Sequence, residues 1–196
     1  MKKTTLIYAL LFTSSLVFSQ NKSEGLPISV GYFGNFLIQP GAKIGAQFSL
    51  NKWETEHEGK KGNYTKEKRI FVSPQVAFFS RPGNNMNLLV NADIGYQRKK
   101  MNQGSYSAVS LGLGYLLESQ VVSIVYNLSD GSIKEKIREP RNYFLPTINY
   151  EFGHAIDFKT NWYMKFSLGS KLSPNRERSG VFLIELGMRH FIGKEE

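Results

Sequence analysis

The feature that most constrains this chain is a two-residue alternation of apolar and polar side chains. Between residues 43 and 50, for example, Ile44 and Phe48 lie on one face of an extended chain and Gln47 on the other. Successive side chains of a β-strand point to opposite faces, so the pattern predicts a strand with one apolar face. Counted from Lys43 onward, it predicts eight strands, near residues 43–50, 70–78, 87–97, 108–117, 122–128, 144–152, 161–169 and 182–189.

The second face of these strands is rich in Gly, Ser, Asn and Gln and poor in the Lys/Glu mixture of a solvated sheet. Small and amide side chains suit the crowded interior of an eight-stranded barrel. We therefore expect an all-β fold, an antiparallel up-and-down transmembrane β-barrel of about eight strands with its apolar face in lipid. A soluble barrel or sandwich also alternates, but it places the apolar face inside.

Single charged residues interrupt the predicted polar faces near mid-strand. In a narrow lumen each of them would need a partner of opposite charge, because burying an unpaired charge is costly. We expect a lumenal charge network made of Lys43, Asp93, Glu151, Lys165, Glu185 and Arg189.

The N-terminus carries the pattern of a secretory signal peptide. Lys2 and Lys3 precede an apolar run, and a cleavage site before Gln20 follows it. Residues 1–19 are thus expected to be removed on export, residues 42–196 to form the barrel, and residues 20–41 to form an N-terminal arm or an extra strand. The arm is the favoured interpretation, because the alternation at residues 28–38 would otherwise make an odd ninth strand.

Charge and predicted loop length point to one end of the barrel. The chain has 25 Lys and Arg against 16 Asp and Glu. Short connections at residues 81–85, 118–120 and 153–157 alternate with longer ones at 51–68, 98–105, 129–142 and 171–180, and the longer ones are expected outside the cell. These longer connections contain a predicted basic external rim of Lys60, Lys61, Arg98, Lys99, Lys100, Lys134, Lys136, Arg138, Arg176 and Arg178, with Lys66, Lys68 and Arg69 nearby. Basic side chains bind phosphate well, so the expected partners are outer-membrane lipids and lipopolysaccharide.

The last strand ends on Gly187-Met-Arg-His-Phe191, an alternating segment that closes on an aromatic residue, and the predicted leader ends on Phe-Ser-Gln. In both features the chain resembles the small eight-stranded outer-membrane barrels of Gram-negative bacteria, and in particular the uncharacterised barrel proteins of the Bacteroidetes group. The resemblance implies an architecture and an outer-membrane location. It brings no functional motif.

Residues for chemistry are few. The chain has no cysteine, and His57, His154 and His190 share no metal-binding spacing, so no metal or cofactor is expected. His154 with Ser167 or Ser170 is a weak candidate for a lipid-modifying pair. The expected function is that of a non-enzymatic structural or accessory barrel, either alone or as a subunit of a larger outer-membrane complex. Nucleic acid is not an expected partner. The alternatives are a narrow channel for small solutes, which inward-facing Phe79 and Leu89 oppose, and a lipid A-modifying enzyme.

Overall fold

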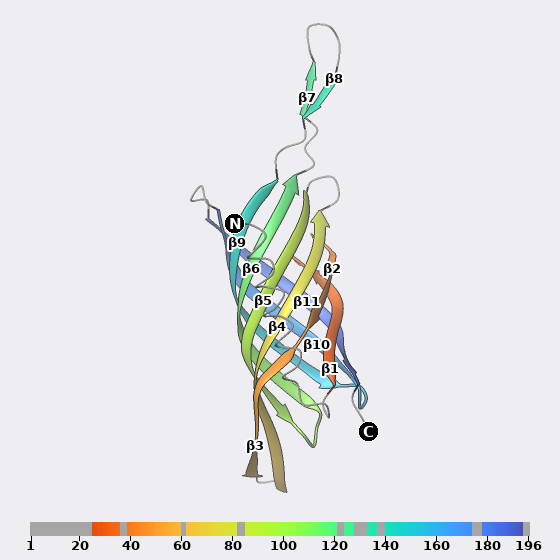
Figure 1. Cartoon of the computed structure of the whole chain (residues 1–196), viewed down its shortest axis with the longest axis vertical. Coiled ribbons are helices and arrows are strands. Elements are labelled where there is room, and N and C mark those ends of the chain that lie inside the picture. The colour runs from red at the N-terminus through yellow and green to blue at the C-terminus, as the bar shows by residue number, and fades with distance from the viewer. Residues whose placement is uncertain are drawn as a thin grey trace, which may run out of the picture.

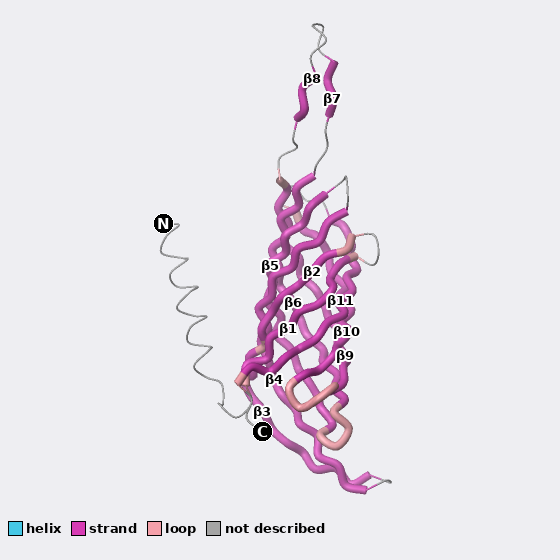
Figure 2. Tube along the Cα trace, turned by 90° about the vertical axis from the view of Figure 1, so that its right-hand side faces the viewer, coloured by secondary structure: helices cyan, strands magenta, loops and turns pink. Residues whose placement is uncertain are grey.

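A computed structural model describes residues 25–35, 39–59, 62–81, 85–120, 124–127, 133–136, 140–173 and 178–193. The regular secondary structure of these residues consists of strands (Figure 2). The strands are β1 (Leu26–Gly34), β2 (Gly41–Ala46), β3 (Phe48–Gly59), β4 (Gly62–Arg81), β5 (Asn85–Lys100), β6 (Ser105–Gln120), β7 (Ile124–Asn127), β8 (Ile133–Lys136), β9 (Arg141–Ala155), β10 (Thr160–Leu172) and β11 (Arg178–Ile192).

Nine of these strands form one antiparallel sheet that closes into a ring (Figure 1). Its order is β2-β1-β11-β10-β9-β6-β5-β4-β3, and a further pairing of β2 with β4 completes the circle. β2 and β3 follow one another along the same edge of β4 with only Gln47 between them, so nine strands occupy eight positions. The ring confirms the predicted all-β antiparallel barrel.

Two of the predicted strand assignments are wrong. Residues 26–34 form the extra strand that was the alternative prediction, and the favoured arm is wrong, because β1 pairs with β11 from Leu26 to Gly34 and with β2 on its other side. The strand predicted at residues 122–128 does not enter the ring. Its described part, β7, pairs with β8 in a separate two-stranded sheet. The first error omits one wall strand and the second adds one, so the predicted number of eight positions still agrees with the ring.

The ring has two distinct ends. We call the end where β1 begins at Leu26 and β11 finishes at Ile192 the terminal end, and the other the distal end. The β5–β6 and β9–β10 turns and the β3–β4 ribbon lie at the terminal end, whereas β4 and β10 end, and β5 and β11 begin, at the distal end, beyond which the paired strands β7 and β8 lie (Figure 1). The predicted alternation of short and long loops is therefore wrong: residues 51–68 belong mainly to the β3–β4 ribbon, and 98–105 contain only a short turn, at residues 101–104, at the terminal end.

The turns at the terminal end are tight and internally bonded. Gly104, with a positive φ of 64°, closes the β5–β6 turn and donates its N–H to the Lys100 carbonyl at 3.0 Å. In the β9–β10 turn the Lys159 N–H donates to Asp157 Oδ1 at 2.7 Å, and this donor holds the pKa of the Asp157 carboxyl below its usual value. Such side-chain bonds within turns are typical of Asp.

The apolar face of the sheet points outward. Side chains such as Leu111, Leu113, Ile148 and Leu168 are about 60% exposed, at 58%, 61%, 63% and 63%. We call the outward-facing apolar residues the apolar belt; they include Val30, Ile44, Val76, Phe78, Val90, Ile94, Val109, Leu111, Leu113, Ile148, Tyr150, Leu168, Leu186 and Met188. Every position of the ring contributes to it.

Candidate functional site

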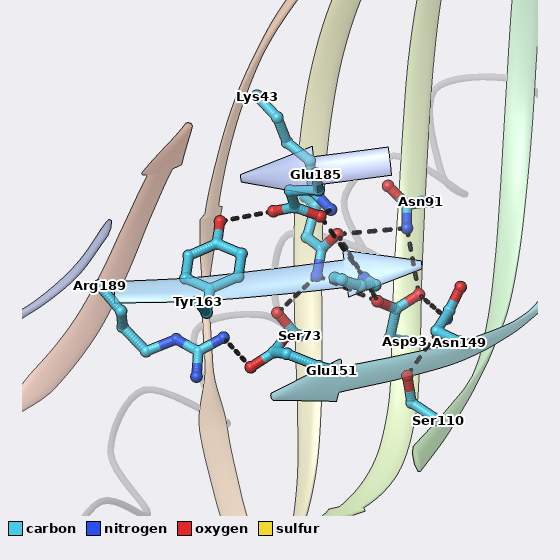
Figure 3. A network of polar contacts seen from close by, with 12 residues as sticks. Lys43, Ser73, Asn91, Asp93, Ser110, Asn149, Glu151, Tyr163, Glu185 and Arg189 are labelled. Atoms are coloured by element: carbon cyan, nitrogen blue, oxygen red, sulfur yellow. Dashed lines mark hydrogen bonds and ion pairs between the residues drawn. The ribbon is translucent and has the colours of Figure 1, made fainter. Parts of the chain in front are cut away.

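The six charged residues expected in the lumen all lie there. Lys43 on β2, Asp93 on β5, Lys165 on β10 and Glu185 on β11 are 2–3% exposed, and Arg189 and Glu151 are nearly as well buried. Three are basic and three are acidic, so the network carries no net formal charge. Figure 3 shows Lys43, Asp93, Glu151, Glu185 and Arg189 gathered together from several different strands.

The centre of the network is a chain of ion pairs that crosses the lumen. Lys43 pairs with Glu185, and Lys165 pairs with Asp93. Lys165 Nζ also lies 3.8 Å from Glu185 Oε2, which joins the two pairs. Tyr163 donates its hydroxyl to the second Glu185 oxygen at 2.5 Å.

Neutral side chains donate further hydrogen bonds to both oxygens of Asp93. Gln75 and Asn91 each donate to its carboxylate at 3.1 Å, and Asn149 donates at 3.3 Å while also donating to Ser110 Oγ at 3.2 Å. A buried ion pair is tolerated only when extra hydrogen bonds satisfy its remaining atoms. The amides that the alternation places on the polar face supply these bonds.

A second layer of the network lies toward the terminal end. Arg189 Nη2 pairs with Glu151 Oε1 at 2.9 Å, and Arg189 Nη1 donates to the Tyr106 hydroxyl at 3.2 Å. The guanidinium carbon lies 5.0 Å from the ring centre of Tyr163 and 5.7 Å from that of Tyr106. Cation–π contacts of this kind stabilise a desolvated arginine.

Several lumenal residues were not recognised from the sequence, among them Tyr163, Tyr106 and Arg69. Tyr163 lies between Asn161 and Lys165, which were assigned to the polar face. Alternation by itself would have placed Tyr163 inside the barrel with them. Tyr106 precedes the predicted strand, which begins too late by a few residues. Arg69 was assigned to an external connection, but it is 4% exposed inside β4 and donates Nε to Gln97 Oε1 at 2.9 Å.

An apolar plug lies in the lumen on the distal side of the ion pairs. Its residues are 8% exposed or less and are Phe33, Ala77, Phe79, Leu89, Leu116, Tyr143, Leu145 and Leu183. The inward orientation expected for Phe79 and Leu89 is therefore found. Where the plug meets the ion pairs, a cavity of about 10 Å³ lies between Leu89, Leu145 and Lys165. That volume holds about one water molecule, so side chains close the lumen at this level.

The predicted basic external rim is not one surface, and this prediction is wrong. Arg98, Lys99 and Lys100 end β5 at the terminal end, whereas Arg178 begins β11 at the distal end. Lys134 and Lys136 lie on β8, beyond the distal end. The predicted strand count omitted the wall strand β1 and included the segment at residues 122–128, which lies outside the ring. Between these two segments, each connection was therefore assigned to the wrong end of the barrel. Lys60, Lys61, Arg138 and Arg176 lie outside the described residues.

The candidate His–Ser pair is not brought together. His154 lies near the end of β9 at the terminal end, where its Nδ1 contacts the Ala155 carbonyl at 2.6 Å. Ser170 is paired in register with Gly180 near the distal end, and Ser167 lies inside the lumen, 6% exposed. Among the residues that the structure describes, no cluster of three or more His, Asp or Glu has a geometry that fits a metal ion.

Within the same described ranges, no helix is long and apolar enough to cross a membrane. No protein-family model matches the chain, and no curated protein matches it in sequence.

Proposed function

We propose that this protein is a non-enzymatic β-barrel of the outer membrane, with a structural or accessory role and a closed lumen. One observation carries the proposal: the exposed outer wall is apolar, while the enclosed interior holds six paired charges. A barrel made for water has the opposite arrangement. A barrel made for lipid has an apolar band outside and polar side chains inside.

The extent of the apolar belt supports a lipid environment. Soluble monomers rarely expose a continuous apolar patch larger than a few hundred Å². Here the belt continues around all eight positions, from Val30 on β1 through Leu111 on β6 to Met188 on β11. In a bilayer that surface needs no protein partner. The eight positions also agree with the proposed kinship to small eight-stranded outer-membrane barrels.

The orientation that we propose is the usual one for small outer-membrane barrels. In such barrels the termini lie in the periplasm and the longer loops outside the cell. The distal end, with its projecting β7–β8 hairpin, would then face outward (Figure 1). Exposed Arg178 and the basic β8 segment would then lie near lipopolysaccharide phosphates. The β3–β4 ribbon would reach into the periplasm, where a further subunit of an outer-membrane complex could bind it.

The closed lumen favours this role over a small-solute channel. The apolar plug and the ion-pair network lie one after the other along the barrel axis, and the cavity between them holds about one water molecule. For the enzymatic alternative, neither Ser167, which lies inside the lumen, nor Ser170, which lies near the distal end, is beside His154 at the terminal end.

Cell fractionation tests the proposal. The full chain, expressed in a Gram-negative host with a C-terminal tag, should sediment with the outer membrane and stay there through carbonate and high-salt washes. Its gel mobility should also change on heating, because a closed barrel resists unfolding in cold detergent. Recovery in the soluble periplasmic fraction would overturn the membrane assignment.

A further inference from the structure

A basic cluster lies on the outside of the wall at the terminal end. It consists of Lys66 and Lys68 on β4 and Arg98 and Lys100 on β5. Their neighbours Glu67 and Arg69 are buried, at 6% and 4% exposure, so alternation directs the four cations outward. In the strand register Lys66 is directly opposite Lys100, and Lys68 is directly opposite Arg98.

Two like-charged pairs on adjacent strands destabilise a sheet unless something neutralises them. Next to them, a cleft of about 270 Å³ is lined by Lys66, Arg98, Lys99, Lys100, Ser105, Tyr106 and Ser107. No acidic residue belongs to this described lining. The cleft therefore combines ammonium and guanidinium groups with serine hydroxyls, a donor set that suits a phosphate group.

Along the outward face of β5, the side chains change from apolar to aromatic and then to basic toward the terminal end. Ile94 belongs to the apolar belt and is 53% exposed. Tyr96 follows on the same face, with its ring 6.0 Å from that of Trp53, and Arg98 Nε then donates to the Tyr96 hydroxyl at 3.3 Å. Tyrosine and tryptophan mark the membrane–water interface, so the cations beyond them lie at the depth of lipid head groups.

We propose that this basic cluster binds the phosphate of a phospholipid in the leaflet at the terminal end, with anionic head groups preferred. The inference rests on the proposed membrane location, and that orientation makes the leaflet the periplasmic one. The phosphate would neutralise the opposed pairs Lys66–Lys100 and Lys68–Arg98, while the acyl chains lie along the apolar belt below Tyr96.

The two tryptophans of the chain provide a matched reporter and control. Trp53 is opposite Lys68 in the register, beside the cluster. Trp162 is similarly exposed, 36% against 37%, and also lies near the terminal end, but β10 is four positions from β4 in either direction around the ring. Trp162→Phe leaves only Trp53, and Trp53→Phe leaves only Trp162.

Each single-tryptophan barrel is reconstituted in phosphatidylcholine vesicles that contain a small fixed fraction of chain-brominated lipid, either phosphatidylglycerol or phosphatidylcholine. Trp53 should be quenched about threefold more strongly by the brominated phosphatidylglycerol, given the attraction of several basic residues for an anionic lipid. Trp162 should show no preference. K66Q/R98Q/K100Q should abolish the preference at Trp53, whereas K159Q, which removes a cation near Trp162, should leave it unchanged.

The outcomes separate this proposal from the membrane proposal. Equal quenching of Trp53 by the two lipids would overturn the binding site while supporting the lipid contact of the barrel. No quenching of either tryptophan would overturn the membrane location as well. The last experiment is calorimetry with inorganic phosphate in neutral detergent. If inorganic phosphate binds saturably, K66Q/R98Q/K100Q loses that binding, and the two lipids quench equally, the cleft binds a soluble phosphate. That result would overturn the lipid as the source of the phosphate.

Discussion

Asp93 on β5 and Lys165 on β10 form an ion pair although 72 residues separate them in the chain. Their strands are not neighbours in the ring, so the pair spans the lumen instead of following the wall. Such a contact links opposite sides of the barrel. Because both side chains are buried, neither charge can lose its partner without a large desolvation cost.

Removing one partner of this pair should destabilise the barrel strongly. Lys165→Met leaves Asp93 buried without its cation, and breaking a buried pair in this way costs about 3–5 kcal/mol. Denaturant unfolding in micelles, followed by tryptophan fluorescence, measures the loss. Arg178→Gln, which removes an exposed cation at the start of β11, is the control and should cost about 0–1 kcal/mol.

The double variant Asp93→Asn/Lys165→Met should recover part of the lost stability, because it strands no charge. If Lys165→Met were no more destabilising than Arg178→Gln, the lumen would be wet. The channel alternative would then replace the closed barrel.

The crowding around Asp93 gives a separate prediction. A Cβ added at Gly112 would lie 2.5 Å from Asp93 Oδ1 and 2.3 Å from Thr147 Oγ1, whereas one added at Gly180 would meet nothing within 4 Å. Gly112→Ala should therefore cost about 1–3 kcal/mol, as overpacking does. Gly180→Ala should change the free energy of unfolding little. Equal effects of the two substitutions would refute the close approach of β6 to the carboxylate.

How far the sequence predicts this fold depends on what each strand contacts. Wall strands such as β5 and β6 separate an apolar from a polar environment along their length, so alternation identifies them and their lumenal charges. The β3–β4 ribbon extends beyond the ring and needs no apolar face, and its charged residues were therefore interpreted as a loop.

Alternation also carries no information about which sheet a strand joins. Alternation was found at residues 28–38 and at 122–128, yet β1 pairs with the C-terminal strand β11 and β7 pairs with its own hairpin partner β8. Pairing between distant segments decides this choice, and local pattern does not record it. The ion-pair residues could be predicted without knowing which strands are neighbours, because a buried charge needs a partner of opposite charge in any arrangement of the strands.

The closed lumen predicts electrical behaviour. The purified barrel in a planar bilayer should show no conductance above that of the bilayer, because the apolar plug formed around Leu116 and Leu145, which are 0% and 1% exposed, excludes hydrated ions. Regular single-channel steps from a homogeneous preparation would contradict this, provided that an unrelated barrel purified in the same detergent gave none.

The outward faces predict a dependence on depth in the bilayer. Leu111→Arg, in the middle of the apolar belt, should cost roughly 2–4 kcal/mol in lipid, because basic residues are most unfavourable at the bilayer midplane. Ser119→Arg, on the same face of β6 but near its distal end and opposite Met86, should cost about 0–1 kcal/mol. Folding titrations in phospholipid vesicles provide the comparison, and a reversed order would invert the assigned depths.

The contact of the apolar belt with lipid can be measured most directly by spin labels. The chain has no native cysteine, so single cysteines at Ser107, Val109, Leu111 and Leu113 can each carry a nitroxide on the outward face of β6. In reconstituted vesicles, the ratio of oxygen to nickel-chelate accessibility should rise from Ser107 to a maximum near Leu111 and Leu113. A low and uniform ratio at all four positions would place this face in water and contradict the membrane barrel.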